Sequence, residues 1–202
     1  RVGVIATSGG DVQWMDLGGS PLDPIFSLRW SPDSRHLLVD TSDLYIKHRR
    51  LLILDPADGK SRFLLQETDP RNVTAEWWAD WAPDGDGIYF SSDRDNDYHI
   101  YRQALTGGEP TPITSGDWAV FSASLSSAGD SLFVVSNEGN AESRRVYRVP
   151  LAGGATRLLT PAQGAHHPVV SPDGRYLADV YSNDVTPPDL HHEIALAALE
   201  AG

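Results

Sequence analysis

The sequence contains no cysteine, a single methionine and few basic residues. Without cysteine, neither disulfides nor thiolate metal sites can form. No apolar run approaches the roughly 18 residues of a membrane-spanning helix, so we predict no membrane span in this segment. The 16 Lys and Arg are outnumbered by 28 Asp and Glu, and the resulting net charge of −12 repels the phosphates of nucleic acids. We therefore expect no nucleic-acid partner.

Glycine and proline are abundant by contrast, with 18 and 14 residues. They fall in small clusters between short apolar runs, which is typical of turns between short strands. With 40% hydrophobic residues, the 202-residue chain can bury a substantial core. The pattern predicts an all-β fold with almost no helix. Because the sequence begins at Arg1 without Met or a signal peptide, we also expect it to be part of a longer protein.

One phrase recurs along the chain: Ser/Ala-Pro-Asp-Gly, or a degenerate copy of it, followed by a strand rich in aliphatic and aromatic residues. The copies begin at Ser31, Ala82, Ser126 and Ser171, at intervals of 51, 44 and 45 residues. Proline presets φ, aspartate bonds the backbone ahead of it, and glycine tolerates positive φ. The phrase predicts hairpin turns at Pro32-Asp33, Asp84-Gly85, Ala128-Gly129 and Asp173-Gly174.

A second phrase comes after the first three copies, in which an apolar strand ends in a small-residue hairpin and another strand leaves it. Its hairpins contain Asp58-Gly59, Gly107-Gly108 and Gly153-Gly154. Each repeat thus holds four strands, and units of this length favour radial stacking over a solenoid. We predict that residues 1–202 form a single segment of a β-propeller, with about four and a half four-stranded antiparallel blades. The approximate blades are 1–17 (partial), 25–67, 73–115, 118–161 and 165–199 (partial).

Several segments resemble known propellers. Residues 80–114, DWAPDGDGIYFSSDRDNDYHIYRQALTGGEPTPIT, are similar to the TolB-like propeller repeat. The segments LLILDPADGKSRFLLQETD (51–69), TSGDWAV (114–120) and SPDGRYLADVYSNDVTPPDL (171–190) resemble the N-terminal propeller of the dipeptidyl peptidase IV branch of the prolyl oligopeptidase family. In that family the last stretch lies shortly before an α/β-hydrolase domain. The resemblance implies the C-terminal half of a longer propeller, in the periplasm or outside the cell.

The family's catalytic nucleophile lies in Gly-x-Ser-x-Gly, and this motif does not occur in the sequence. We therefore predict no catalytic residue and no cofactor, and no peptidase activity for this chain alone. The acidic pair that would hold a substrate's amino terminus is also missing, since Glu67 and Glu76 each stand alone.

The resemblance implies a non-catalytic propeller that gates access to, and scaffolds, a hydrolase domain of the same parent chain. The parent would be a serine exopeptidase with a peptide substrate. The alternative is a non-enzymatic TolB-like propeller, periplasmic or secreted, that binds a protein.

Two histidine clusters, His166-His167 and His191-His192-Glu193, contain residue types that ligate zinc. Adjacent residues of a strand point to opposite faces, so neither pair converges on one ion. We interpret these histidines as surface or inter-blade residues and predict no metal site.

Asp93, Asp95 and Asp97 alternate as in a calcium-binding loop. However, Tyr98 and Gln103 occupy the positions where such a loop needs Gly and Glu. We interpret this segment as a hairpin turn rich in Asp and Asn.

The densest aromatic stretch, Glu76-Trp77-Trp78-Ala79-Asp80-Trp81, opens a blade, where the first strand lines the central channel. Alternation places Trp77, Ala79 and Trp81 on one face and the other three residues on the opposite face. We expect one set to pack in an aromatic core. In the alternative, Glu76 and Trp78 face the channel and contact a peptide.

The terminal segments supply only partial blades, with two strands in 1–17 and about three in 165–199. Paired with each other, they would close a ring. The resemblance instead places them in different blades of a longer propeller. We therefore predict open edges and self-association through the terminal blades.

Overall fold

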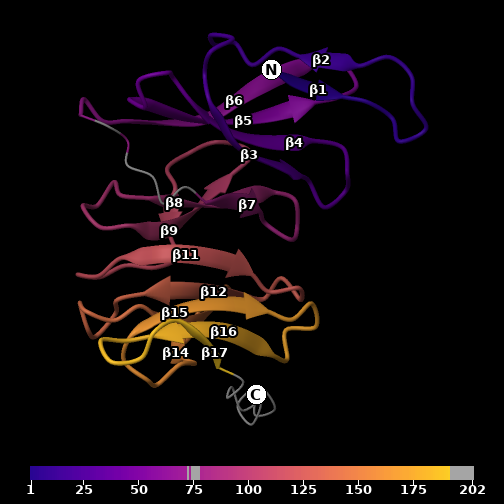
Figure 1. Cartoon of the computed structure of the whole chain (residues 1–202). Helices are drawn as coiled ribbons and strands as arrows, with labels where there is room; N and C mark the ends of the chain where they lie inside the picture. Colours follow the sequence, from indigo (N-terminus) through magenta and orange to yellow (C-terminus); the bar gives the residue numbers. More distant parts are fainter. Residues whose placement is uncertain (72, 74–77, 192–202) are drawn as a thin grey trace. The chain divides into compact units, whose positions relative to one another are not determined.

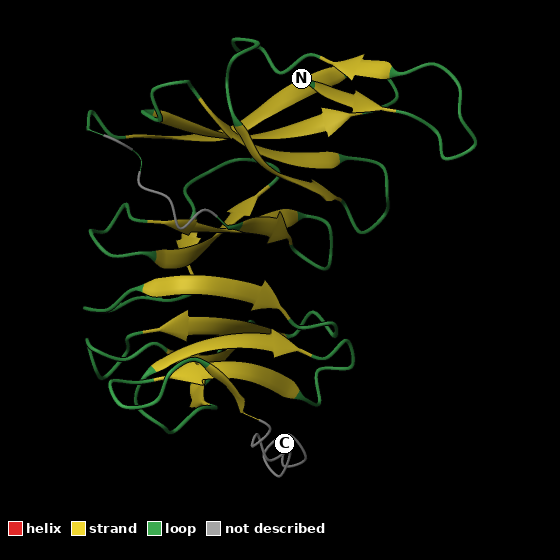
Figure 2. Cartoon of the chain, viewed as in Figure 1, coloured by secondary structure: helices red, strands yellow, loops and turns green. Residues whose placement is uncertain are grey.

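The computed structural model describes residues 1–71, 73 and 78–191. These residues form seventeen strands and no helix (Figures 1 and 2). The all-β prediction is confirmed. The described part of the chain has no helix long and apolar enough to cross a bilayer.

Five sheets contain the strands, and in each of them neighbours in the sequence are also neighbours in the sheet. The first holds β1 (Val2–Val4) and β2 (Gln13–Met15). The second holds β3 (Ile25–Trp30), β4 (Leu37–Ser42), β5 (His48–Asp55) and β6 (Lys60–Thr68), and the third holds β7 (Ala79–Trp81), β8 (Gly87–Ser92), β9 (His99–Ala104) and β10 (Thr111–Pro112). The fourth holds β11 (Val120–Leu125), β12 (Ser131–Ser136), β13 (Arg145–Pro150) and β14 (Arg157–Leu158), and the fifth holds β15 (Ala165–Val170), β16 (Leu177–Ser182) and β17 (Asp189–His191). The predicted four-stranded repeat is thus present in the second, third and fourth sheets.

The chain divides into two compact units. Unit 1 comprises residues 1–90 and 101–111, and unit 2 comprises residues 91–100 and 112–202. The division falls within β8, after Phe90, and within β9, after Ile100.

The recurring Ser/Ala-Pro-Asp-Gly phrase forms the same turn four times. In each copy the amide of the fourth residue donates to the carbonyl of the first over 2.8 to 2.9 Å, and the fourth residue has a φ between 59° and 73°. In the three copies that begin with serine, its hydroxyl also accepts the amide of a residue farther along, at His36, Ser131 and Tyr176. The four predicted turns, which end at Ser34, Gly85, Gly129 and Gly174, are confirmed.

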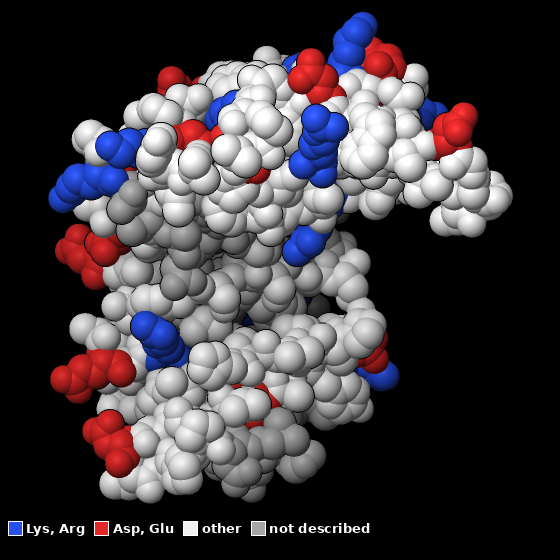
Figure 3. Space-filling view, turned by 45° about the horizontal axis from the view of Figure 1, so that its top comes forward, with Lys and Arg blue, Asp and Glu red and all other residues white. Residues whose placement is uncertain are grey.

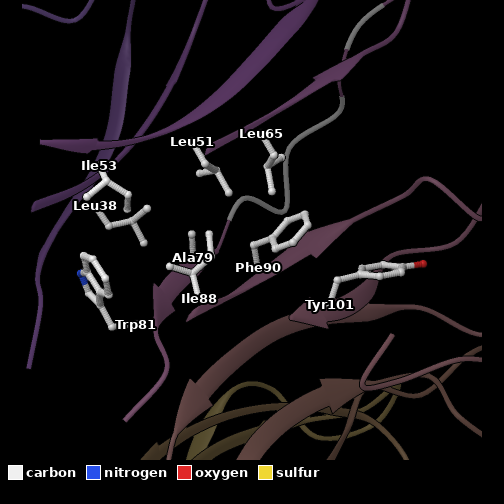
Figure 4. Packing of buried hydrophobic residues seen from close by; sticks show 9 residues of the cluster. All are labelled: Leu38, Leu51, Ile53, Leu65, Ala79, Trp81, Ile88, Phe90 and Tyr101. Atoms are coloured by element: carbon white, nitrogen blue, oxygen red, sulfur yellow. The ribbon is translucent and has the colours of Figure 1, made fainter. Parts of the chain in front are cut away.

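The core of unit 1 lies on both faces of the second sheet, because β4 and β5 are rich in apolar residues. Their register pairs Leu38 with Ile53 on one face, and Leu37 with Leu54 on the other. The first face packs against the third sheet in a cluster of Leu38, Leu51, Ile53, Leu65, Ala79, Trp81, Ile88, Phe90 and Tyr101 (Figure 4). The opposite face packs against Val2 and Met15 of the first sheet. Alternation along each strand therefore covers both faces of one sheet.

Unit 2 shows the same pattern in its fourth sheet. All six residues of β12 are buried, and they pair with β13 in an unbroken register from Ser131–Pro150 to Ser136–Arg145. The apolar runs of the second and third strands thus fix the core of each repeat.

Ser34 has a φ of 59° at the position where the other three copies of the phrase have glycine. The left-handed conformation destabilises an L-residue by about 1–2 kcal/mol. Glycine avoids this strain, but the greater flexibility of its unfolded state offsets about 0.5–1 kcal/mol of the gain. We expect Ser34→Gly to raise the free energy of unfolding by about 0.5–1 kcal/mol in urea titrations.

The matched control is Gly85→Ser. Its φ is 73° and no heavy atom lies within 4 Å of the added Cβ, so only backbone strain is introduced. This variant should lose about 1 kcal/mol. If Ser34→Gly leaves the urea midpoint unchanged while Gly85→Ser lowers it, the two turns are not equivalent.

Candidate functional site

The aromatic stretch at the start of the third sheet is anchored by two residues of β7. Ala79 and Trp81 are buried in the unit 1 cluster, 2% and 3% exposed, and the Trp81 Nε1 donates to the Arg29 carbonyl over 3.0 Å. Ala79 and Trp81 of the predicted inward face therefore pack in the core, in a cluster that also contains Phe90 and Tyr101. Glu76 and Trp77 lie outside the described residues. Trp78 is half-buried, and its facing toward a channel remains a prediction.

Asp80 follows on the opposite face of β7, across from Tyr89 of β8. Burial disfavours its carboxylate and raises its pKa above the ordinary value, and this effect outweighs the Trp81 N–H, which donates to Oδ1 over 2.8 Å, and the nearby charge of Arg29. Because burial disfavours the charged form of Asp80, its ionisation at neutral pH destabilises the folded state. Carboxylates with a raised pKa are enriched at functional sites, so Asp80 is a candidate site residue.

A buried ion cluster surrounds Arg49, which is 1% exposed at the start of β5. Its Nε and Nη2 donate to the two oxygens of Asp40 over 3.0 and 2.7 Å, and its Nη1 donates to Glu67 over 3.2 Å. The Trp78 carbonyl lies 3.4 Å from Nη2. Burial opposes the guanidinium charge, but Asp40 and Glu67 outweigh burial and raise the pKa of Arg49. The cluster joins β4, β5 and β6 to the chain just before β7.

Sequence analysis missed this cluster. Glu67 stands alone in the sequence, yet the register places it directly across from Arg49. The available signal was a charged residue within each of two apolar strands: Arg49 in HRRLLILD and Asp40 in LLVDTS. Only the strand register shows that these charges meet.

Two histidines of unit 2 are buried and hydrogen-bonded. His99 lies between the Thr114 hydroxyl, at 3.1 Å from Nδ1, and the Gly116 carbonyl, at 3.0 Å from Nε2. His166 contacts Asp179 through Nδ1 at 2.5 Å and the Ala162 carbonyl through Nε2 at 3.0 Å. Both rings thus have partners on both nitrogens, as expected of structural histidines.

The predicted histidine clusters do not converge within the described residues. His167 is exposed while His166 is buried. The backbone of His191 pairs with Asp179, but its side chain, together with His192 and Glu193, lies outside the described part of the chain. Over residues 1–71, 73 and 78–191, no set of three His, Asp or Glu is arranged to hold a metal ion.

The Asp93 to Asp97 segment forms the turn between β8 and β9. The Asn96 amide donates to the Asp93 carbonyl over 2.9 Å, and Asn96 has a φ of 82°. Asparagine tolerates this left-handed conformation better than most residues. The interpretation as an Asp- and Asn-rich hairpin turn agrees with this geometry.

Charged side chains of both signs are interspersed on one face of the molecule and in two grooves. On the face that Figure 3 shows, Lys and Arg side chains lie among acidic and uncharged ones. A groove of about 300 Å³ in unit 1 mixes both signs, with Asp55, Asp58, Lys60 and Arg62 among its lining residues. A groove of about 190 Å³ in unit 2 does the same with Asp130, Arg148, Asp173 and Arg175. Three ion pairs lie among these lining residues: Lys60 with Asp58 at 3.2 Å, Arg148 with Asp130 at 3.2 Å and Arg175 with Asp173 at 2.7 Å.

The comparisons with known proteins identify the family. Residues 1–188 match the model of the dipeptidyl peptidase IV (DPP IV) N-terminal region. The chain belongs to this family. An uncharacterized protein of Agrobacterium fabrum is 25% identical over 86% of this chain and 72% of its own length.

Three solved structures resemble this DPP IV N-terminal segment. A Bacteroides ovatus protein assigned as a dipeptidyl aminopeptidase IV has a TM-score of 0.78 at 19% identity, over 93% of this chain and 30% of its own. Porphyromonas gingivalis dipeptidyl peptidase 4 has a TM-score of 0.75 at 23% identity, over 87% and 25%. TolB from Acinetobacter baumannii has a TM-score of 0.64 at 19% identity, over 93% and 44%.

These likenesses establish the fold as a partial β-propeller of four-stranded antiparallel blades. The segment spans less than half the length of each of these solved chains.

The Arg49 cluster allows a direct test. Arg49→Met leaves Asp40 buried without its counter-charge, so we expect a loss of about 3–5 kcal/mol in the free energy of unfolding. The double variant Arg49→Met/Asp40→Leu should recover part of this loss, because the two fully buried charges are gone and only Glu67, whose side chain is 11% exposed, loses its ion pair to Arg49. The control is Arg35→Met, since Arg35 pairs with Asp33 at 3.9 Å with 80% and 54% of the side chains exposed, and it should change stability by less than about 1 kcal/mol. Equal effects of Arg49→Met and Arg35→Met would refute the assignment.

The raised pKa of Asp80 predicts that the stability of the fold depends on pH. Because its folded pKa is raised, ionisation at neutral pH destabilises the fold, and protonation removes that penalty as pH falls through the folded pKa. Asp80→Asn should therefore be more stable than the parent at pH 7, and the difference should vanish near the ordinary pKa of 3.8. Urea midpoints between about pH 3 and 8 test this.

Asp173 is the control, because its pKa is shifted in the opposite direction. The Ser171 hydroxyl, Arg175 and the Arg175 amide lower the pKa of Asp173 to about 2. Asp173→Asn should therefore be less stable than the parent at neutral pH, with the deficit shrinking on acidification. An Asp80→Asn difference that stays constant with pH would contradict the raised pKa.

Proposed function

We propose that this segment is the non-catalytic propeller part of a serine exopeptidase resembling DPP IV. In this role it gates access to, and scaffolds, a hydrolase domain supplied by the rest of the parent chain. The observation that carries the proposal is the match of residues 1–188 to the DPP IV N-terminal region. The absence of Gly-x-Ser-x-Gly from the 202 residues supports a role that is not catalytic.

Within each unit, the geometry supports gating by rigid sheets. In both units the second strand of a four-stranded sheet is buried on both faces, so the sheets hold their shape without a ligand. Half-buried Trp78 and Asp80 on the first part of the third sheet are the groups that we assign to contact a peptide, with Glu76 as the predicted third member. An aromatic side chain beside a carboxylate suits a peptide that carries an apolar residue and a positive charge.

A second candidate function is a TolB-like protein-binding propeller without enzymatic activity. It is favoured by the likeness to Acinetobacter baumannii TolB over 93% of this chain. The two functions predict different continuations of the gene beyond residue 202. A hydrolase domain with Gly-x-Ser-x-Gly supports the peptidase, and any other continuation supports the binding protein.

Activity assays separate the two functions. The purified segment should not cleave Gly-Pro-p-nitroanilide, whereas the full gene product should do so, and replacing the serine of its Gly-x-Ser-x-Gly by alanine should abolish turnover. In the full protein, Asp80→Asn should raise KM for a dipeptide substrate by several-fold with little change in kcat, and Asp173→Asn serves as a matched control outside the candidate site. A full-length protein without turnover would reject the peptidase assignment.

A further inference from the structure

The outer edge of the second sheet differs from those of the third and fourth sheets. Its outer strand, β6, has nine residues, whereas β10 and β14 fill the same place with two residues each. The two short copies show that the repeat does not need a long outer strand. In the described part of the chain, no strand pairs with the outer side of β6. The N–H and C=O groups that such a strand turns away from its sheet can pair with another chain.

Proline protects the shorter edges but not β6. Pro110 precedes β10 and Pro112 lies within it, and Pro161 follows soon after β14. Proline has no N–H to donate, so it interrupts pairing along an edge. β6 contains no proline, but its register with β5 shifts at Leu64, and this bulge limits a partner strand to one side of it. Residues 60–63, which precede the bulge and keep an unbroken register with β5, are named the 60–63 edge.

The 60–63 edge has a basic side and an apolar side, because adjacent residues of a strand point to opposite faces of the sheet. Lys60 and Arg62 are exposed on one face, where they line the groove of about 300 Å³. Phe63 is on the other face and is 56% exposed. A strand added at this edge would therefore place alternate side chains beside cationic groups and the others beside an aromatic ring.

Arg62 is placed to bind a carboxylate. Its Nη1 donates to the Leu105 carbonyl over 2.8 Å, and the guanidinium has further N–H groups in the same plane. Of the acidic residues in the groove, Asp55 accepts a backbone amide, and Asp58 pairs with Lys60 at 3.2 Å. The side chains of that pair are 46% and 80% exposed, so an incoming carboxylate competes with Asp58 at little loss. Asp or Glu side chains of a partner thus suit the basic side of the edge.

We propose that the 60–63 edge pairs with an extended segment of another protein, which adds a fifth strand to the second sheet. Main-chain hydrogen bonds supply the affinity, and alternating acidic and apolar side chains supply the specificity. The acidic side chains lie against Arg62 and Lys60, and the apolar ones lie against Phe63. The paired surface is small, so the binding is weak, with a Kd on the order of 100 µM. The site uses none of the residues assigned to peptide contact above, and it is independent of the proposed peptidase function.

Fluorescence anisotropy of a fluorescein-labelled peptide of alternating Glu and Val residues tests the pairing. We expect saturable binding to the purified chain. Arg62→Glu and Phe63→Ser should each raise the Kd by about fivefold or more, because one introduces like charge and the other removes the apolar contact. The same peptide with Lys in place of Glu should bind about tenfold more weakly or worse.

The fourth sheet provides matched control variants. Arg157 and Leu158 of β14 occupy the places that Arg62 and Phe63 have in β6, but on a strand of two residues. Arg157→Glu and Leu158→Ser should therefore leave the Kd of the peptide unchanged.

N-methylation of the peptide distinguishes strand pairing from charge attraction. A paired strand turns only alternate N–H groups toward its neighbour, so methylating either all Glu or all Val amides should abolish binding of one peptide and spare the other. The proposal is overturned if the unmethylated peptide does not bind at chain concentrations of about 1 mM, if both edge variants leave its Kd unchanged, or if the two methylated peptides bind alike. A dimer in sedimentation equilibrium that Phe63→Ser dissociates would show a second copy at the edge, and would equally overturn it.

Discussion

The second and third strands of each repeat carry apolar residues on both faces, and the rest of the structure depends on that constraint. In unit 1, Leu38 and Ile53 pack on one side of the second sheet while Leu37 and Leu54 pack on the other. A sheet of this kind is unstable alone, because each buried aliphatic side chain stabilises by about 1.5–3 kcal/mol only when something covers it. The repeat therefore has to stack, and this is why a propeller segment consists of similar sheets in series.

Within such a sheet, charge is tolerated only where it is paired. Arg49 lies at the start of β5 and contacts Asp40 on β4 and Glu67 on β6, so the cluster spans three strands of the sheet. Burying these ions contributes little net stability. A one-residue slip of β5 would move Arg49 to the opposite face, away from both carboxylates, so the cluster penalises wrong registers.

The sequence predicted the elements that depend on local chemistry. These turns are set by the φ preferences of adjacent residues, and each copy keeps Pro-Asp, Gly or both, so all four turns, including the one that ends in Ser34, could be located. The Arg49 cluster and the burial of His99 and His166 depend on partners 9 to 18 residues away. Such partners meet only through the strand register, which periodicity does not specify. The channel-facing assignment of Trp78 depends on more than its own strand, and Glu76 lies outside the described residues.

Repetition shows where this chain departs from the needs of its fold. Four turns place a residue at positive φ, and in three of them glycine satisfies the requirement without strain. In the hairpin between β8 and β9, Asn96 has a φ of 82° and tolerates this conformation, but at the same place between β4 and β5 Ile46 has a φ of 57° against its own steric preference. Asp80 departs in a second way, since burial makes its charged form unfavourable on a strand that packs well through Ala79 and Trp81. Both departures reduce stability, so stability alone does not account for them, and they mark residues at which function is to be sought.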